Sequence, residues 1–204
     1  MKIGIYGGTF NPVHKGHTSL AESLVQQGLV DEVWLLVSPL NPFKQANTAE
    51  FAPYDDRLRM TELAVQRKKG LRASDFENHL PLPSYMYNTL QALSTTYPEH
   101  EFHLVIGADN WQRFGQWYKS QELLSEFPLL IYRRPGYDLD EEKWVIKGPD
   151  PLITHEPKSV KIVDTPLYDI SSTQLREAIR KGHLSSRWLS APVVRYIAEH
   201  DLYK

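Results

Sequence analysis

Two histidines stand three residues apart near the start of the sequence, directly after a glycine turn, in the stretch GIYGGTFNPVHKGH. Gly7 and Gly8 allow the backbone to approach a ligand closely and to turn N–H groups toward phosphate oxygens. His14 and His17 lie at positions i and i+3, so their side chains share one face of an opening helical turn. Gly16 between them leaves room for a flat base or a ribose. The pattern favours a phosphate site over a surface histidine pair or a zinc pair, for which no third ligand is evident.

A second candidate phosphate site lies far downstream, in YDISSTQLREAIRKG. Ser171 and Gln174 match the capping box S-x-x-Q, which predicts that a helix starts there. A helix N-terminus attracts anions, the hydroxyls of Ser172 and Thr173 add donors, and Arg176 follows about one turn later. Taken alone, this pattern is more typical of an ordinary capped helix. Together with the two histidines it predicts a triphosphate that lies between two helix starts.

Short apolar runs alternate with longer segments of helical period along the chain. The runs KIGIY, EVWLLV, EFHLVI, PLLIYR and VKIV predict strands, several of them buried on both faces. The segments with helical period predict helices over 17–27, 54–68, 85–95, 111–126, 171–181 and 192–200. This alternation is typical of an α/β fold, in which helices cover both faces of a parallel sheet. Ligands of such sheets bind beyond the carboxyl ends of the strands.

The composition excludes several classes of protein. The chain has 204 residues, 41% of them hydrophobic, which predicts one domain over 1–204 with a helical segment from about 171 at its C-terminal end. Lys and Arg number 23 against 25 Asp and Glu, a net charge of −2, so no positive field favours nucleic acid. There is no cysteine, and no apolar run of about 18 residues predicts a membrane span. We expect a cytoplasmic protein without nucleic-acid or membrane partners, and a homo-oligomer stays an open alternative.

GGTFNPVHKGH and ISSTQLR together resemble the nucleotidylyltransferase family. IGADNWQRFGQW and RRPG make the chain similar to the nicotinate-nucleotide adenylyltransferases of that family, from Lys2 to VRYIAEHDLY. The resemblance implies a Rossmann-like sheet and the transfer of the adenylyl group of ATP to nicotinate mononucleotide. The products are nicotinate adenine dinucleotide and pyrophosphate, in NAD biosynthesis. It also implies Mg²⁺ as the ion that accompanies ATP, with no separate metal site on the chain.

The resemblance also assigns roles to individual residues at the phosphates. His17 is placed at the α-phosphate, His14 beside it, Arg176 at the β- and γ-phosphates, and Lys44 near the phosphates of both substrates. Lys44 could equally be a solvated loop residue. The residues implied to bind ATP are Gly7, Gly8, Thr9, Phe10, His14, Gly16, His17, Gly107, Asp109, Ser172, Thr173 and Arg176.

For nicotinate mononucleotide, the resemblance implies that Trp117 stacks on the pyridine ring. Backbone N–H groups near Thr89 and Tyr118 would donate to its carboxylate. Asp109 is expected to bind a ribose hydroxyl, with a loop cap as the alternative. Arg133 is expected to meet a phosphate or to pair with a carboxylate.

Four residues depart from the pattern of the family. Asn11 replaces the more usual acid of the first loop, and Phe43 stands where a histidine often precedes Lys44. Met86 and Asn88 replace a hydroxyl residue and an acid. These exchanges bear on the choice of acceptor more than on adenylyl transfer. A different acceptor, such as nicotinamide mononucleotide, and a nucleotide-binding sensor without turnover are the two alternatives.

Overall fold

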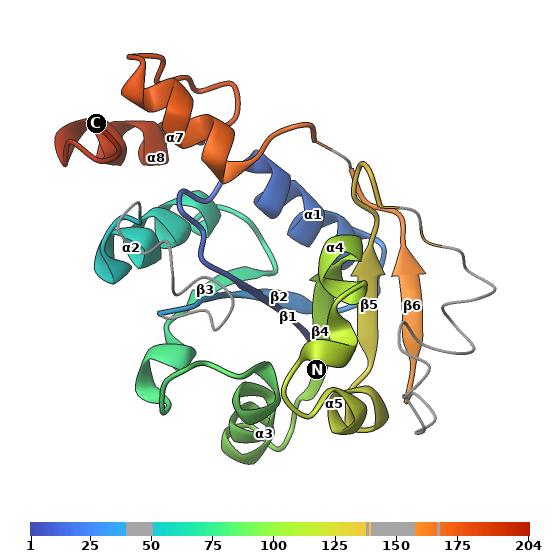
Figure 1. Cartoon of the computed structure of the whole chain (residues 1–204). Coiled ribbons are helices and arrows are strands. Elements are labelled where there is room, and N and C mark those ends of the chain that lie inside the picture. Colours follow the sequence, from blue (N-terminus) through green and yellow to red (C-terminus); the bar gives the residue numbers. More distant parts are fainter. Residues whose placement is uncertain (40–50, 138, 140–157, 167) are drawn as a thin grey trace.

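A parallel six-stranded sheet forms the centre of the computed structural model, which describes residues 1–39, 51–137, 139, 158–166 and 168–204 (Figure 1). Lys44, Phe43 and most of the stretch 134–158 therefore lie outside the described residues. The order of the strands is β3-β2-β1-β4-β5-β6, and every neighbouring pair is parallel. The strands are β1 (Lys2–Gly8), β2 (Glu32–Val37), β3 (Leu71–Ser74), β4 (Glu101–Gly107), β5 (Leu129–Tyr132) and β6 (Val160–Val163).

The direction in which the chain builds the sheet reverses between β1 and β4. The first three strands extend the sheet to one side of β1, and β4, β5 and β6 extend it to the other. Where the order reverses, the loops that leave the two central strands turn to opposite faces and open a crevice at the carboxyl ends. In this chain the crevice lies between Gly8, the end of β1, and Gly107, the end of β4.

Helices cover both faces of the sheet, as the alternation of the sequence predicts (Figure 1). One hydrophobic cluster joins the sheet to α1, α2, α7 and α8, and a second joins the opposite face to α3, α4 and α5. Two 3₁₀ helices, η2 and η3, complete these layers. The bounds are α1 (Lys15–Gln26), α2 (Tyr54–Val65), η2 (Phe76–His79), α3 (Met86–Thr96), α4 (Ala108–Trp111), η3 (Phe114–Gln116), α5 (Ser120–Glu126), α7 (Ser172–Arg180) and α8 (Ala191–Glu199).

The predicted fold class is confirmed, but one predicted helix is wrong and one strand was missed. The segment 111–126 is not one helix, because the chain turns between α4 and α5 and Lys119 adopts a φ of 52°, which no helix interior accepts. The edge strand β3 was not predicted at all. Its sequence, LRAS, is too short and too polar to stand out from a loop.

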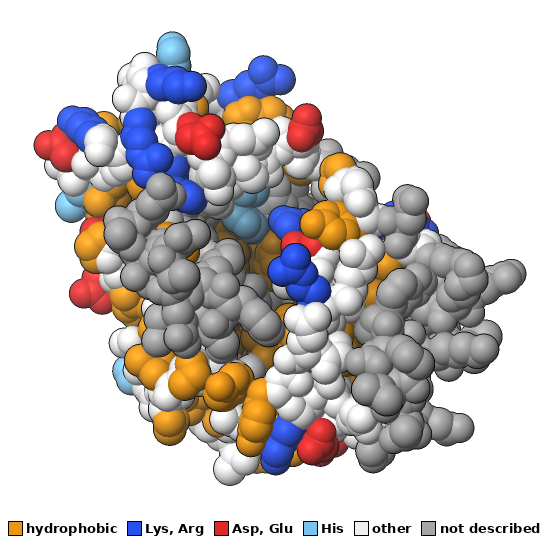
Figure 2. All heavy atoms as spheres, viewed as in Figure 1, with side chains coloured by type: hydrophobic (Ala, Val, Ile, Leu, Met, Phe, Trp, Pro, Cys, Tyr) orange, Lys and Arg blue, Asp and Glu red, His pale blue; other side chains and the backbone are white. Residues whose placement is uncertain are grey.

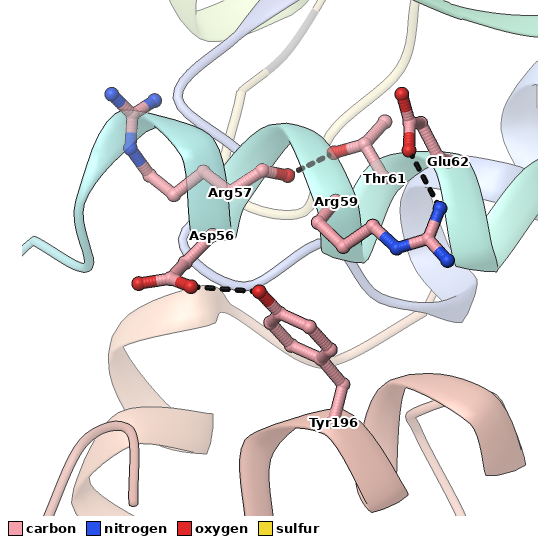
Figure 3. Close-up of polar contacts among 6 residues, drawn as sticks. All are labelled: Asp56, Arg57, Arg59, Thr61, Glu62 and Tyr196. Carbon is pink, nitrogen blue, oxygen red and sulfur yellow. Dashed lines mark hydrogen bonds and ion pairs between the residues drawn. The ribbon is translucent and has the colours of Figure 1, made fainter. Parts of the chain in front are cut away.

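The C-terminal helix α8 packs on α2, which lies over the same face of the sheet (Figure 3). The hydroxyl of Tyr196 in α8 donates a hydrogen bond of 2.8 Å to Oδ1 of Asp56 in α2. On the exposed side of α2, Arg59 pairs with Glu62 over 2.9 Å. The described end of the chain is thus tied to the first half of the fold.

A buried carboxyl joins β2, η2 and α3 on the other side of the sheet. Glu77 of η2 is 2% exposed, and its Oε1 accepts a hydrogen bond of 3.0 Å from the hydroxyl of Thr89 in α3. Ser38, just after β2, also bonds to this carboxyl. Burial raises the pKa of Glu77 to about 7, while the two hydroxyl groups act in the opposite direction.

The raised pKa of Glu77 predicts a loss of stability with rising pH. The unfolded chain releases this proton near pH 4.5 and the folded chain only near pH 7, so the free energy of unfolding falls between these values. Glu77→Gln removes the titration. We expect the stability of this variant, relative to wild type, to increase by about 3 kcal/mol from about pH 4.5 to about pH 8, in urea unfolding at each pH. Glu62→Gln, on the exposed side of α2, is the control and should show no such change; the same result for both variants would contradict the assignment.

Candidate active site

A cavity of about 590 Å³ opens at the carboxyl ends of β1 and β4, where the strand order reverses. Figure 2 shows histidine side chains in a central hollow of this face, with basic and acidic side chains beside it. Segments from the whole chain contribute to the wall. The described lining residues are Tyr6, Gly7, Gly8, Thr9, Phe10, Asn11, His14, His17, Phe51, Met86, Leu104, Val105, Ile106, Gly107, Asp109, Asn110, Trp117, Tyr132, Arg134, Ser171, Ser172, Thr173 and Arg176.

Side chains lie close against the two glycines at the end of β1. A Cβ atom on Gly8 would lie 2.9 Å from the ring of Phe10, and one on Gly7 would lie 2.8 Å from Cε of Met86. Phe10 itself has a φ of 45°, a left-handed conformation that a bulky residue rarely adopts. Its ring meets the imidazole of His17 edge-on, with 5.1 Å between the ring centroids. The loop is therefore strained and closely packed, as functional loops often are.

The two histidines lie together at the start of α1. Their ring centroids are 3.7 Å apart, and the backbone N–H of His14 donates to Nδ1 of His17 over 3.2 Å. Because Nδ1 of His17 accepts this bond, the proton of the neutral ring is on Nε2. The hydrogen bond from the backbone N–H of His14 therefore makes Nε2 of His17 a hydrogen-bond donor.

The imidazole of His14 is buried beside an arginine. His14 is 6% exposed, and its Nδ1 has no hydrogen-bond partner among the described residues. Burial, and to a lesser extent the charge of Arg134, lowers the pKa of His14 from 6.5 to about 4. A Cβ atom on Gly16 would lie 2.9 Å from Nδ1 of this ring. Gly16 thus makes room for His14, whereas the sequence suggested room for a base or a ribose.

The N-terminus of α7 forms the opposite wall. The predicted capping box is confirmed: Ser171 accepts from the backbone N–H of Gln174, and the Gln174 side chain accepts from that of Ser171. The hydroxyl of Ser172 donates to the carbonyl of Pro12 over 3.0 Å. Arg176 is 7% exposed, and its Nη1 donates to the carbonyl of Asn11 over 3.0 Å. Two of these contacts fix α7 directly to the loop after β1.

Buried polar side chains hold the loop after β1 in place. Nη1 of Arg57 donates to the carbonyls of Thr9 and Ser38, each over 2.8 Å. Oδ1 of Asn11 accepts from the backbone N–H of Ala52 over 3.0 Å and from the hydroxyl of Tyr203 over 2.8 Å. Asn11, a departure from the family pattern, is therefore used to anchor the loop.

The far side of the cavity carries an ion pair. Nη1 of Arg134 lies 2.9 Å from Oδ2 of Asp109, while Oδ1 of Asp109 is buried and has no partner among the described residues. Gly107 is needed here, because a Cβ atom would lie 2.4 Å from Oδ1 of Asp109. Trp117 is half-buried at the edge of the cavity, with its ring centroid 5.6 Å from that of Phe114.

The structure brings most of the predicted site residues to this cavity, but among the described ones Gly16, Thr89, Tyr118 and Arg133 do not line it. Thr89 does not line it: its N–H donates to the carbonyl of Tyr85 within α3, and its hydroxyl binds Glu77. Tyr118 is 46% exposed and packs on Tyr85 instead. Arg133 pairs with Asp164 over 3.2 Å and lines a smaller pocket on the other side of the two histidines.

Other lining residues were missed by the sequence analysis. Arg134 takes the place expected for its neighbour Arg133, and RRPG gives no sign of which arginine faces inward. Tyr6 and Tyr132, whose hydroxyls lie 3.3 Å apart, are buried residues of β1 and β5, on either side of β4, and resemble core residues in the sequence. Met86 was noted only as a departure from the family pattern.

No group of three or more His, Cys, Asp or Glu that could hold a metal occurs within the described ranges. Asp109 is the one carboxylate among the described lining residues. The other polar groups of the described wall are imidazoles, guanidinium groups, hydroxyls, amides and backbone groups. Such a donor set suits a polyphosphate, and it suits a metal ion that arrives on that polyphosphate.

The fold and the cavity define a nucleotide-binding α/β protein of the doubly wound class, with its ligand site at the reversal of strand order. A family profile described as cytidylyltransferase-like matches residues 5–178. A protein of Bacteroides thetaiotaomicron named "probable nicotinate-nucleotide adenylyltransferase" is 43% identical over 98% of this chain and 92% of its own length. A protein of Porphyromonas gingivalis with the same name is 38% identical over 94% and 91%.

A solved structure shares the fold. The nicotinic acid mononucleotide adenylyltransferase of Plasmodium falciparum, complexed with NaAD, matches with a TM-score of 0.77 at 18% identity, over 99% of this chain and 97% of that one. The chain belongs to the cytidylyltransferase-like family and, within it, to the nicotinate-nucleotide adenylyltransferases.

In the described part of the chain, the helices are too short or too polar to span a bilayer.

The environment of His14 predicts that its imidazole stays neutral in mildly acidic solution. In an NMR titration of the ring protons, we expect a midpoint near pH 4 for His14. Arg134→Met removes the smaller cause and should raise the midpoint by part of the shift, because burial remains. Arg133→Met, which changes a neighbouring arginine that does not contribute to this shift, is the control and should leave the midpoint unchanged. A wild-type midpoint at the ordinary 6.5 would contradict the assignment.

Proposed function

We propose that the chain transfers the adenylyl group of ATP to nicotinate mononucleotide and releases pyrophosphate. The observation that carries this proposal is the convergence of His14 and His17, at the start of α1, with Arg176, at the start of α7, on one cavity. The names of the relatives support the choice of substrates. So does the complex of the Plasmodium enzyme with NaAD.

The chemistry requires the protein to position anions and needs no general base. The phosphate of the acceptor is largely dianionic at neutral pH, because its second pKa is about 6, and it attacks the α-phosphorus of ATP. The P–O bond to the leaving pyrophosphate breaks as the new P–O bond forms, roughly in line with it. The protein must align the two substrates and stabilise charge on the α-phosphoryl oxygens.

His17 is suited to the α-phosphate, because the hydrogen bond from the backbone N–H of His14 to Nδ1 leaves the proton of the neutral His17 ring on Nε2. His14 lies beside it and adds a second imidazole to the same wall. Arg176, with the hydroxyl of Thr173 and the first backbone N–H groups of α7, holds the β- and γ-phosphates at the positive end of α7, while the hydroxyl of Ser172 donates to the carbonyl of Pro12. The fixed geometry of these donors means that little reorganisation is needed during the reaction.

Mg²⁺ would accompany ATP and balance the charge of its phosphates. The one carboxylate in the described wall, Asp109, keeps a buried oxygen without a partner among the described residues. This oxygen is suited to a ribose hydroxyl of the bound nucleotide. The Arg134 guanidinium, paired with the other oxygen, holds Asp109 in place.

The nicotinate carboxylate is better placed at the start of α3 than at Thr89. Met86, the first residue of α3, lines the cavity, and the first N–H groups of a helix have no partners within the helix. A carboxylate there would accept from these groups and benefit from the helix dipole. Trp117, on the same side, would stack on the pyridine ring.

The use of ATP and the lack of cysteine fit a cytoplasmic location.

The proposed function is tested by mixing the purified protein with ATP, Mg²⁺ and nicotinate mononucleotide. We expect pyrophosphate and the dinucleotide to form in equal amounts. Release of phosphate in place of pyrophosphate, or no turnover with saturating substrates, would contradict the proposal. ATP binding without turnover would favour the nucleotide-binding sensor.

His17→Ala removes the donor proposed for the α-phosphate. Loss of one preorganised donor costs about 3 kcal/mol in the transition state, so kcat should fall by about 10²- to 10³-fold while the Tm is kept. His183→Ala, which removes an exposed histidine after α7, is the matched control and should turn over like wild type. An unchanged kcat in folded His17→Ala would refute the role of His17.

The start of α3 predicts a preference for nicotinate over nicotinamide mononucleotide. The amide of nicotinamide would turn an NH₂ donor toward N–H donors, and each buried polar group left unpaired costs about 1–3 kcal/mol. We expect kcat/KM to be about 10- to 100-fold higher for nicotinate mononucleotide, measured with ATP saturating. Equal values for the two acceptors would show that helix N–H groups do not read this substituent.

A further inference from the structure

Tyr203, which follows α8, reaches the loop after β1 without lining the cavity. Its hydroxyl donates to Oδ1 of Asn11 over 2.8 Å, across 192 positions of the sequence. The backbone of Tyr203 has a φ of 66°, a left-handed conformation that is unfavourable for a bulky residue. Its side-chain contacts therefore have to hold the residue in this conformation.

Asn11 connects this hydroxyl to the phosphate site. Asn11 is 2% exposed and lines the cavity, and its backbone carbonyl accepts the bond of 3.0 Å from Nη1 of Arg176. Its side-chain Oδ1 accepts from Tyr203 and from the N–H of Ala52. The side chain thus fixes the residue whose carbonyl orients the Arg176 guanidinium.

The surroundings keep the hydroxyl of Tyr203 protonated at neutral pH. Burial raises its pKa, and the charge of Asp56 acts in the same direction, while Arg176 and Arg57 lower it by less. The group is therefore an O–H donor to Asn11 under assay conditions. The charges of the two buried arginines that hold the loop, Arg176 and Arg57, both act on this hydroxyl.

We propose that Tyr203 is a positioning residue for ATP. Its hydroxyl fixes Asn11, and Asn11 fixes the Arg176 guanidinium at the β- and γ-phosphates. The inference rests on the proposed adenylyl transfer and deepens it, because it gives a role in the ATP site to a residue outside the cavity wall.

Tyr203→Phe keeps the ring and removes only the hydroxyl. We expect the KM for ATP to rise about fivefold to tenfold, the size of one lost hydrogen bond, with the KM for nicotinate mononucleotide changed less than about twofold. The matched control is Tyr196→Phe, which removes a hydroxyl that donates over the same 2.8 Å to Asp56, between α8 and α2 (Figure 3). The control should leave both KM values within about twofold of wild type. Equal KM values for ATP in the two variants would overturn the proposal.

A double-mutant cycle shows whether Tyr203 acts through Asn11. If it does, adding Tyr203→Phe to Asn11→Ala should change the KM for ATP by less than about twofold, because the acceptor is already gone. Two effects that multiply would mean that the hydroxyl acts elsewhere, and would also overturn the proposal.

Thermal unfolding separates this inference from the proposed reaction and from a loss of fold. A ligand that binds the folded state raises the Tm, so ATP with Mg²⁺ should raise the Tm of Tyr203→Phe by less than that of Tyr196→Phe. The measurement needs no acceptor and no turnover, so it stands even if the wild type forms no dinucleotide. The Tm without ATP reports the fold itself. An equal rise in the two variants would contradict the positioning role.

Discussion

The hydrogen bond from Arg176 to the carbonyl of Asn11 is the contact on which the site depends, because it joins segments 165 positions apart. A buried guanidinium is costly unless hydrogen-bond acceptors satisfy it. Arg176 finds one of them in the loop after β1, so α7 can be placed only where that loop already has its final shape. The loop is shaped in turn by Arg57, whose Nη1 donates to two carbonyls of neighbouring segments. Two buried arginines therefore hold the loop that forms one wall of the cavity.

The sheet supplies the frame for this arrangement. Reversal of the strand order between β1 and β4 leaves a crevice at their carboxyl ends, and glycines end both strands. Phe10 and Met86 occupy the space that side chains on Gly8 and Gly7 would need. Because Gly8 and Gly7 have no side chains, two residues can lie at the edge of the cavity: Phe10, which packs on His17, and Met86, at the start of α3. Packing and ligand access depend on the same two positions.

Local patterns in the sequence were enough to predict both halves of the site and the fold class. The capping box at Ser171 is a contact within four residues, and the structure has it as predicted. Contacts that depend on which way a side chain points were not predictable. β5 is buried on both faces, so no alternation of polar residues shows that Arg134 and not Arg133 faces the cavity. The sequence also did not show that Thr89 lies one turn inside α3, where its N–H donates to the carbonyl of Tyr85.

The two sides of the phosphate site are also separated in time. During synthesis, β1 and both histidines leave the ribosome more than 150 residues before the guanidinium that faces them. Until α7 has been made, a nascent chain contains only the wall of the cavity formed by the loop after β1 and the start of α1. Before α7 is made, the chain contains the sequences of all six strands, but the second wall of the cavity is missing. On the proposed assignment, the second wall of the ATP site is therefore in place only when the last helices have been made and have docked.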